Sequence, residues 1–232
     1  MIYICRDFTV GCTEDFCKRL PERRAKRAER YVRKEDKCLC GLSYGLFQYG
    51  MEQSYQKSYD KDWETDRWGK PYLPDCPQIA FNISHCEGCV VCGFSDRSIG
   101  VDVQDYNSMT MEIADFLWQA EDRTHLLHEK NWKKSLCMLW CIKEAYVKCI
   151  GTGMGDAAFE KGFKDLNKGN IGEGNFIYYG YYFSIFDLGT HSVVICANEF
   201  IKKEHIREVK VYYDRTGKWD FLADWTGGEK KG

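Results

Sequence analysis

The sequence predicts an α+β fold made of two similar halves. Helical patterns come first and three short strands follow, and the same order of helices and then strands repeats after residue 106. This order of elements favours sheets packed against helices within each half. The chain has 232 residues, of which 44% are hydrophobic, which is enough for one large domain or two closely packed small ones. We expect an N-terminal half over residues 1–105 and a C-terminal half over residues 106–232.

The N-terminal half is expected to contain two helices among short strands. Residues 2–7 alternate as in a strand, and a charged helix follows Pro21, since proline is favoured at the first helical position. A second helix over residues 34–53 is predicted from leucines at helical spacing. The segment 68–71, Trp-Gly-Lys-Pro, is a turn signal. Apolar runs then predict three strands, over residues 79–84, 89–94 and 99–103.

The C-terminal half repeats this order with a stronger helix. Helices are predicted over residues 109–118 and 135–150. Aromatic and β-branched runs follow, and we expect them to form one antiparallel sheet. These runs cover residues 176–186, 191–197 and 209–213. The last six residues, 227–232, are expected to be disordered.

Composition points to the cytoplasm and away from membranes. The N-terminus carries a charge at its sixth residue and has no apolar segment of the kind found in signal peptides. No run approaches the roughly 18 apolar residues that a membrane span needs. Thirteen cysteines in such a chain are therefore expected to be reduced thiols.

Charge is concentrated near the N-terminus, although the formal net charge is only −2. Between Lys18 and Lys37 there are ten lysines and arginines against four acidic residues. A basic helix of this kind could bind phosphate groups, contact RNA or remain a solvated face. RNA-binding modules interleave aromatic side chains with the basic ones, and only Tyr31 is present here. We therefore expect no nucleic-acid partner.

Asp102 stands out because it interrupts an apolar strand, Ile-Gly-Val-Asp-Val. Its neighbours Val101 and Val103 point to the opposite face of that strand. A carboxylate in this position needs a cation or several hydrogen-bond donors. A surface salt bridge is the simpler interpretation of Asp102 taken alone.

A second group of polar residues lies on the predicted helix over residues 135–150. Trp140, Glu144 and Lys148 are spaced four residues apart and share one helix face. Glu144 and Lys148 could form an ordinary i,i+4 ion pair. Alternatively, carboxylates from a strand and a helix could together hold a hard divalent cation such as Mg²⁺, which then binds substrate phosphates.

Taken in order, these segments resemble the signature blocks of surfactin-type 4′-phosphopantetheinyl transferases. The resemblance covers roughly residues 20–155, and the ordered set of blocks is more specific than any one of them. The matching blocks are Pro21-Glu22-Arg23-Arg24-x-Lys26, Lys34-Glu35-Asp36, Gly69-Lys70-Pro71, Ser84-His85, Gly100-Val101-Asp102 and Trp140-x-x-Lys143-Glu144-Ala145-x-x-Lys148.

The resemblance implies two pseudo-symmetric halves, each with a small antiparallel sheet packed against helices, and an active site in the cleft between them. It implies transfer of the phosphopantetheine arm of coenzyme A to a serine of an acyl or peptidyl carrier protein, assisted by Mg²⁺. Asp102 and Glu144 would be the metal ligands, and Lys148 would lie near the phosphates. Glu144 and a metal-bound water are both candidates for the base. Coenzyme A contacts are implied for Arg23, Lys26, Lys70, Ser84 and His85.

One position departs from the family pattern. Many relatives carry glutamate two residues after the aspartate, as a third metal ligand, whereas this chain has Gln104. An amide oxygen can bind Mg²⁺ but adds no charge, so Gln104 is the weakest member of the predicted ligand set. A non-catalytic protein that binds coenzyme A or a nucleotide is the alternative function. Because one chain would complete the site, a monomer is expected.

The cysteines compete with this interpretation. Cys86, Cys89 and Cys92 are spaced like part of an iron–sulfur motif. If residues 89–94 form a strand, however, Cys89 and Cys92 point to opposite faces and cannot share a metal. We therefore expect them to be small buried apolar residues.

Overall fold

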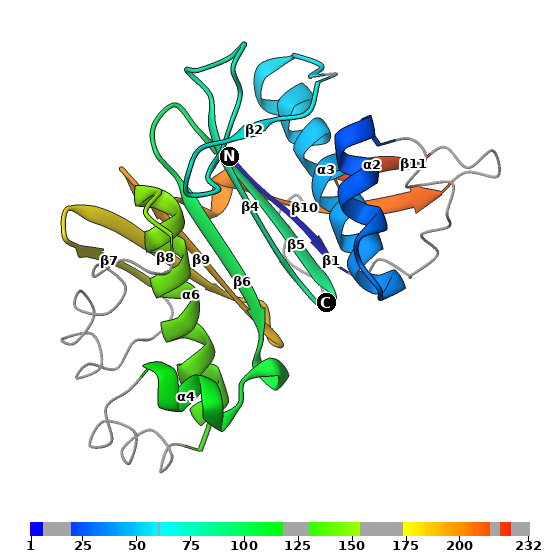
Figure 1. The fold of residues 1–232 in the computed structure, drawn as a ribbon. Coiled ribbons are helices and arrows are strands. Elements are labelled where there is room, and N and C mark those ends of the chain that lie inside the picture. The colour runs from blue at the N-terminus through cyan, green and yellow to red at the C-terminus, as the bar shows by residue number, and fades with distance from the viewer. Residues whose placement is uncertain (7–19, 60, 118–129, 154–173, 214–218, 224–232) are drawn as a thin grey trace, which may run out of the picture.

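The computed structural model describes residues 1–6, 20–59, 61–117, 130–153, 174–213 and 219–223. It has a mixed α+β architecture with two separate sheets, each packed against helices (Figure 1). The predicted α+β class is thereby confirmed. No helix in the described ranges combines the length and apolar character that crossing a membrane requires.

The first sheet has five strands in the order β11-β10-β1-β5-β4. β1 pairs in parallel with β10, and the other neighbours are antiparallel. Two helices lie beside this sheet, with a small hairpin of β2 and β3 near them (Figure 1). The bounds are β1 Ile2–Arg6, α2 Glu22–Glu29, α3 Lys34–Tyr55, β2 Glu64–Thr65, β3 Pro71–Tyr72, β4 Ala80–Cys86, β5 Cys89–Ser95, β10 Ile206–Tyr213 and β11 Trp219–Ala223.

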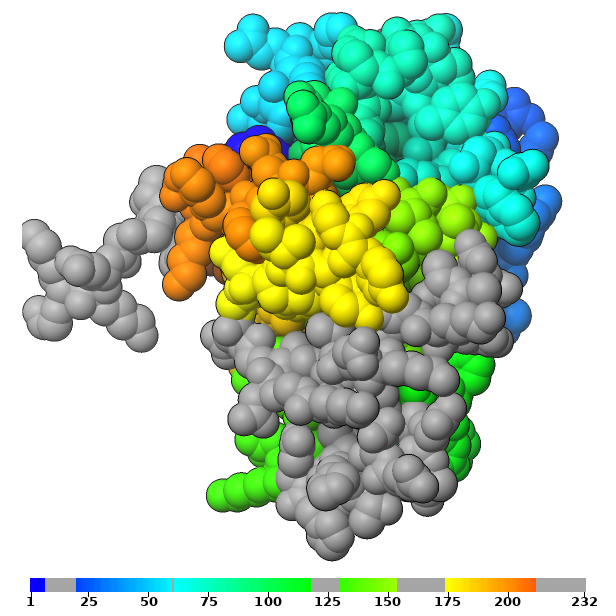
Figure 2. Space-filling model, turned by 90° about the vertical axis from the view of Figure 1, so that its left-hand side faces the viewer, coloured from blue at the N-terminus to red at the C-terminus, as the bar shows by residue number. Residues whose placement is uncertain are grey.

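The second sheet has four antiparallel strands in the order β6-β9-β8-β7. Helix α6 packs on it, and Figure 2 shows β7 and β8 (yellow) beside part of α6 (yellow-green). The bounds are β6 Gly100–Asp105, η1 Tyr106–Ser108, α4 Met111–Leu117, α6 Trp132–Ile150, β7 Gly174–Tyr178, β8 Tyr181–Asp187, β9 His191–Ala197 and η3 Lys203–His205.

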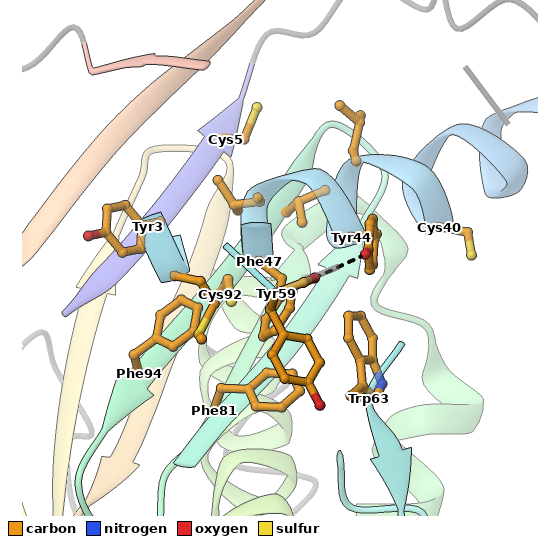
Figure 3. Close-up of a cluster of buried hydrophobic side chains, with 14 of the residues drawn as sticks. Tyr3, Cys5, Cys40, Tyr44, Phe47, Tyr59, Trp63, Phe81, Cys92 and Phe94 are labelled. Carbon is orange, nitrogen blue, oxygen red and sulfur yellow. Dashed lines mark hydrogen bonds between the residues drawn. The ribbon is translucent and has the colours of Figure 1, made fainter. Parts of the chain in front are cut away.

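Three apolar clusters hold these layers together. The first lies between α3 and the first sheet, where Phe47 packs against Phe81 and Phe94 with ring centroids 4.7 and 5.9 Å away (Figure 3). The second lies between α6 and the second sheet. The third combines β1 and β5 with β6 and β9, and it uses residues that alternate with those of the other two clusters. Because alternate strand residues face opposite sides, the two sheets pack on each other and the helices lie outside.

Most predicted elements are confirmed, with shifts of a few residues at their ends. The three strands predicted over residues 79–103 are β4, β5 and β6, and the helix predicted over 135–150 is α6. The run 176–186 forms two strands, because Tyr179 and Gly180 turn the chain with positive φ angles of 49° and 77°. Trp118 and the 227–232 tail lie outside the described residues.

The prediction of one antiparallel C-terminal sheet was wrong for residues 209–213. These residues belong to β10, which pairs in parallel with β1 in the first sheet. The physical reason is burial, because Val209 is fully buried in the first apolar cluster. As a result, each sheet contains strands from both sides of residue 105.

Gly100 determines how closely α6 approaches β6. A Cβ atom at this position would overlap the backbone of α6 at Ala145 and Cys149. Only glycine therefore allows the helix to lie directly on the strand. This contact brings the adjacent helix residues, Glu144 and Lys148, close to β6.

We expect Gly100→Ala to destabilise the protein more than Gly93→Ala. The Gly100 methyl group would meet backbone atoms that cannot move alone, whereas a Gly93 methyl would meet the side-chain tip of Val101 at 2.8 Å. Overpacking costs about 1–3 kcal/mol, so we expect about 3 kcal/mol or more for Gly100→Ala and about 1 kcal/mol for Gly93→Ala. Urea unfolding of both variants measures this difference. Equal losses would show that the α6–β6 contact does not depend on Gly100.

Candidate active site

β4 and β6 are edge strands of different sheets, and side chains join them. Asn82 Oδ1 accepts a hydrogen bond from the Val101 N–H at 2.9 Å, and Ser84 Oγ accepts one from the Val103 N–H at 3.4 Å. Buried backbone N–H groups need such acceptors. The two contacts align β4 with β6 so that Ser84 lies beside Asp102.

Asp102 is 1% exposed and belongs to a buried polar network. Its Oδ1 accepts hydrogen bonds from Ser84 Oγ at 2.7 Å and from Lys148 Nζ at 2.5 Å. Its Oδ2 is also buried and has no hydrogen-bond partner among the residues that the structure describes. A buried carboxylate oxygen without a partner is costly, so this atom is suited to a further cation.

Helix α6 contributes two charged residues that face Asp102. Lys148 Nζ lies 3.2 Å from Ser84 Oγ and 3.8 Å from Glu144 Oε2. Burial alone would lower the pKa of Lys148, but the charges of Asp102 and Glu144 outweigh it and raise that pKa overall. The ammonium group therefore stays protonated between two carboxylates.

Glu144 is held in an environment that disfavours its charge. Its side chain is only 13% exposed, and burial raises its pKa. The Asp102 charge raises that pKa further, while Lys148 lowers it. A cation of higher charge beside Glu144 would therefore be stabilised by both carboxylates.

A pocket of about 260 Å³ opens beside these charges. Its lining comes from α2, α3, the β2–β3 hairpin, β4 and the end of α6, so residues far apart in the chain meet there. Cations and aromatic rings share the lining. The lining residues used below are these cations and rings, Arg24, Arg27, Trp63, Lys70, His85 and Lys148, together with the carboxylate of Glu144.

The basic helix α2 presents different cations to this pocket from those predicted. Arg24 and Arg27 line it, whereas Arg23 and Lys26 lie in an adjacent outer groove on the exposed side of α2. The sequence did contain a signal. Ala28, four residues after Arg24, is fully buried, so these two residues mark the inward face of the helix.

Arg24 is fixed at the pocket wall by two neighbours. Its Nε lies 2.6 Å from Asp62 Oδ1, and its guanidinium group lies 3.5 Å from the centre of the Trp63 ring. Trp63 also belongs to the first apolar cluster (Figure 3). Arg24 therefore connects the core of the first sheet to the pocket.

Lys70 and His85 line the pocket as the motifs suggested, but Lys70 makes protein contacts. Its Nζ donates to Ser98 Oγ at 2.8 Å and to the Cys149 carbonyl at the end of α6. Burial lowers the pKa of Lys70. His85 is exposed on β4, and desolvation, Lys148 and Arg27 lower its pKa. The protonation of Lys70 and of His85 therefore depends on the groups that fill the pocket beside them.

Gln104 lies two residues beyond Asp102 on the same face of β6. It is half-buried and is not among the residues that line the pocket. The backbone carbonyl oxygen of Gln104 accepts a hydrogen bond from Cys137 Sγ at 3.4 Å. The structure therefore brings Asp102, Glu144 and Lys148 together, with Gln104 at their margin.

The cysteines of β5 lie as the strand pattern predicted. Cys89 is buried in the cluster between the sheets, and Cys92 is buried in the cluster under α3. They therefore point to opposite faces. In the described ranges, no three Cys, His, Asp or Glu side chains are grouped so that they could hold a metal by themselves. A metal at Asp102 and Glu144 would need further ligands from substrate or water.

Comparison with known proteins finds similarity to one family of enzymes. Residues 98–195 match the family model of the 4′-phosphopantetheinyl transferase superfamily. This range contains Asp102, Glu144 and Lys148. Over this part of the chain, the sequence is therefore similar to the 4′-phosphopantetheinyl transferase superfamily.

The relatives that the chain matches include transferases of the Sfp type, which confirms the resemblance drawn from its motifs. The chain is 28% identical over 156 residues to the 4′-phosphopantetheinyl transferase Sfp of Bacillus subtilis, covering 66% of this chain and 70% of the relative. It is 33% identical over 91 residues to the transferase gsp of Aneurinibacillus migulanus, covering 38% of each chain. A more distant relative is pptA of Paxillus involutus, with 25% identity over 153 residues, covering 56% of this chain and 58% of that relative.

Ser84→Ala is expected to cost more stability than Ser43→Ala, although both hydroxyl groups are buried. Removing Ser84 Oγ takes a donor from Asp102 and an acceptor from the Val103 N–H, with an expected cost of about 1–3 kcal/mol. Ser43 Oγ only donates to the Leu39 carbonyl within its own helix. For Ser43→Ala we expect less than about 1 kcal/mol. Urea unfolding compares the two, and equal costs would contradict the proposed role of Ser84 between the sheets.

Proposed function

We propose that this chain transfers the 4′-phosphopantetheine group of coenzyme A to a serine of an apo acyl or peptidyl carrier protein and releases adenosine 3′,5′-bisphosphate. Similarity to the superfamily and to its Sfp-type members supports this reaction. The structural observation that carries it is the buried Asp102 carboxylate, which faces Glu144 and Lys148 beside a pocket lined by cations. Such a site suits a substrate with several phosphate groups.

The residues present fit Mg²⁺, which we propose as the metal. Asp102 offers a buried oxygen without a hydrogen-bond partner in the described part of the chain, and the carboxylate of Glu144 belongs to a side chain that is 13% exposed. Carboxylate oxygens are the ligands that Mg²⁺ prefers. Gln104 remains the proposed third and weakest protein ligand. When bound, Mg²⁺ would neutralise charge that builds up on the phosphate oxygens during transfer.

The chain's own residues account for the rest of the proposed chemistry. The serine oxygen forms a new P–O bond, the pyrophosphate linkage breaks, and the departing bisphosphate keeps the electron pair of that linkage. Lys148 provides positive charge beside the phosphates, where negative charge increases in the transition state. Glu144 is a candidate acceptor for the serine proton, since burial raises its pKa.

Coenzyme A is proposed to lie in the pocket with its 3′-phosphate towards α2. Arg23, Lys26, Lys70, Ser84 and His85 stay in the proposed binding set. We add Arg27, because it lines both the pocket and the outer groove. Clustered cations of this kind bind a phosphomonoester well.

The finer architecture is proposed on the same basis. The pocket is taken as the cleft between two pseudo-symmetric halves divided near residue 105, since both parts of the chain contribute to its lining. One chain supplies all the proposed site residues, which supports a monomer. A cytoplasmic location accords with a carrier-protein substrate.

Incubation with coenzyme A, Mg²⁺ and apo carrier proteins tests the reaction, because each true substrate gains the mass of one phosphopantetheine group.

Asp102→Asn and Glu144→Gln should each lower the rate of transfer by about 10²- to 10³-fold. Both changes remove a charge but keep the shape of the side chain, and the amide oxygen introduced by Asp102→Asn can still accept hydrogen bonds from Ser84 and Lys148. The folded state should therefore persist in circular dichroism. The rate is measured at limiting Mg²⁺ by mass spectrometry of the carrier protein.

Glu199→Gln is the matched control, because it removes the same charge at an exposed position away from the pocket. It should transfer at the rate of the unmodified protein. Full activity in Asp102→Asn or in Glu144→Gln would exclude the carboxylate that the variant removes as a metal ligand.

Arg27→Gln should weaken coenzyme A binding more than it weakens dephospho-coenzyme A binding. Loss of one charge-assisted hydrogen bond costs about 1.5–3 kcal/mol, or roughly 10- to 150-fold in affinity. Arg23→Gln and Lys26→Gln should show the same preference to a smaller degree, because both residues lie in the outer groove and not in the pocket. Lys26 is also paired with Glu22 at 2.5 Å. Calorimetric titration with both ligands measures the preference. A larger effect at Arg23 than at Arg27 would place the 3′-phosphate in the outer groove instead.

A further inference from the structure

Lys148 occupies the space between the two proposed metal ligands. Its ammonium nitrogen lies 2.5 Å from Asp102 Oδ1 and 3.8 Å from Glu144 Oε2. Asp102 is almost fully buried, whereas the Lys148 side chain is 28% exposed and lines the pocket. The charge that neutralises the carboxylates in the ligand-free protein therefore comes from a side chain that can still reach the pocket.

A divalent cation held by Asp102 and Glu144 would compete with Lys148 for the same carboxylates. Two like charges so close together, in surroundings that are largely shielded from water, repel each other strongly. The cation can therefore bind well only if the ammonium group moves or gains an anion of its own. Leaving the ammonium in place would make binding unfavourable.

The pocket contains room for such an anion on the side where Lys148 is exposed. Ser84 Oγ, 3.2 Å from Lys148 Nζ, would remain as a fixed partner of both Asp102 and the lysine. A phosphate oxygen of bound coenzyme A could then accept the ammonium group as it leaves Asp102. The lysine needs only a change in its side-chain torsions, because α6 itself is fixed on β6 at Gly100.

We propose that Lys148 is the resident counter-ion of the metal site and makes divalent-cation binding depend on coenzyme A. This inference rests on the proposed function and goes beyond it by assigning an order of binding. Without coenzyme A, Lys148 holds the carboxylates and the metal binds weakly. With coenzyme A, the phosphates take the ammonium group and the metal binds tightly. By linkage, the metal must strengthen coenzyme A binding by the same factor.

The test measures Mn²⁺ binding by electron paramagnetic resonance, with Mn²⁺ in place of Mg²⁺ and no carrier protein present. Lys148→Gln keeps a hydrogen-bond donor for Asp102 but removes the charge. Without coenzyme A, this variant should bind Mn²⁺ at least about 10-fold more tightly than the unmodified protein. Adding coenzyme A should tighten Mn²⁺ binding by about 10-fold or more in the unmodified protein and by much less in Lys148→Gln.

Lys133→Gln is the matched control, since it removes the same charge from the first turn of the same helix, far along α6 from Lys148. It should bind Mn²⁺ as the unmodified protein does. If Lys148→Gln binds Mn²⁺ no more tightly than Lys133→Gln, Lys148 is not a competitor and the inference is wrong.

If the proposed metal site itself is wrong, Mn²⁺ binding to a second variant shows it. Asp102→Asn should abolish tight Mn²⁺ binding in the presence of coenzyme A. If it does not, the metal lies elsewhere, and both the metal site and this inference are overturned. If Lys148→Gln does not fold, the ¹⁵N signal of the Lys148 ammonium group can be followed in the unmodified protein. That signal should move with Mg²⁺ and coenzyme A together and stay in place with Mg²⁺ alone at the same concentration, and displacement by Mg²⁺ alone would contradict the proposal.

Discussion

The burial of one carboxylate, Asp102, is the constraint on which the rest of the site depends. An ionised group that is almost fully removed from water must have partners, and here they come from three different elements. β6 contributes the carboxylate, β4 contributes Ser84 and α6 contributes Lys148. Satisfying this single charge therefore fixes the relative positions of both sheets and the helix. The geometry that stabilises the fold and the geometry that could bind a phosphate ester are the same.

The contact between β4 and β6 shows how the edges of two sheets can be joined through side chains and not through paired backbones. Asn82 and Ser84 act as acceptors for N–H groups at an edge of the second sheet. Unpaired sheet edges invite pairing with other chains, and native proteins cover them. Here the covering side chain, Ser84, also orients the Asp102 carboxylate. The cost is that a change at Ser84 affects the packing of the sheets and the site together.

The sequence predicted the elements well because local periodicity determines them. Short apolar runs predicted the strands from 79 to 103, and helical spacing placed Glu144 and Lys148 on one face of α6. It could not predict that β10 pairs with β1, since pairing depends on contacts between residues about 200 positions apart. The bond from Ser84 to Asp102 and the role of Gly100 were missed for the same reason. The inward face of α2 was also missed. Ala28 gave a weak local signal for it, but the residues that bury Arg24, namely Asp62 and Trp63, are distant in the chain.

The parallel pairing of β1 with β10 also has a consequence for how the protein is made. β1 leaves the ribosome before its parallel neighbour, which begins at Ile206, about 200 residues later. At a translation rate of about 5–20 residues per second, β10 is made roughly 10–40 s after β1. The strands of the second sheet end at Ala197, so this sheet can close before the first one does. One edge of β1 therefore stays without its strand partner until β10 has been made, whereas the other edge can pair with β5 much earlier.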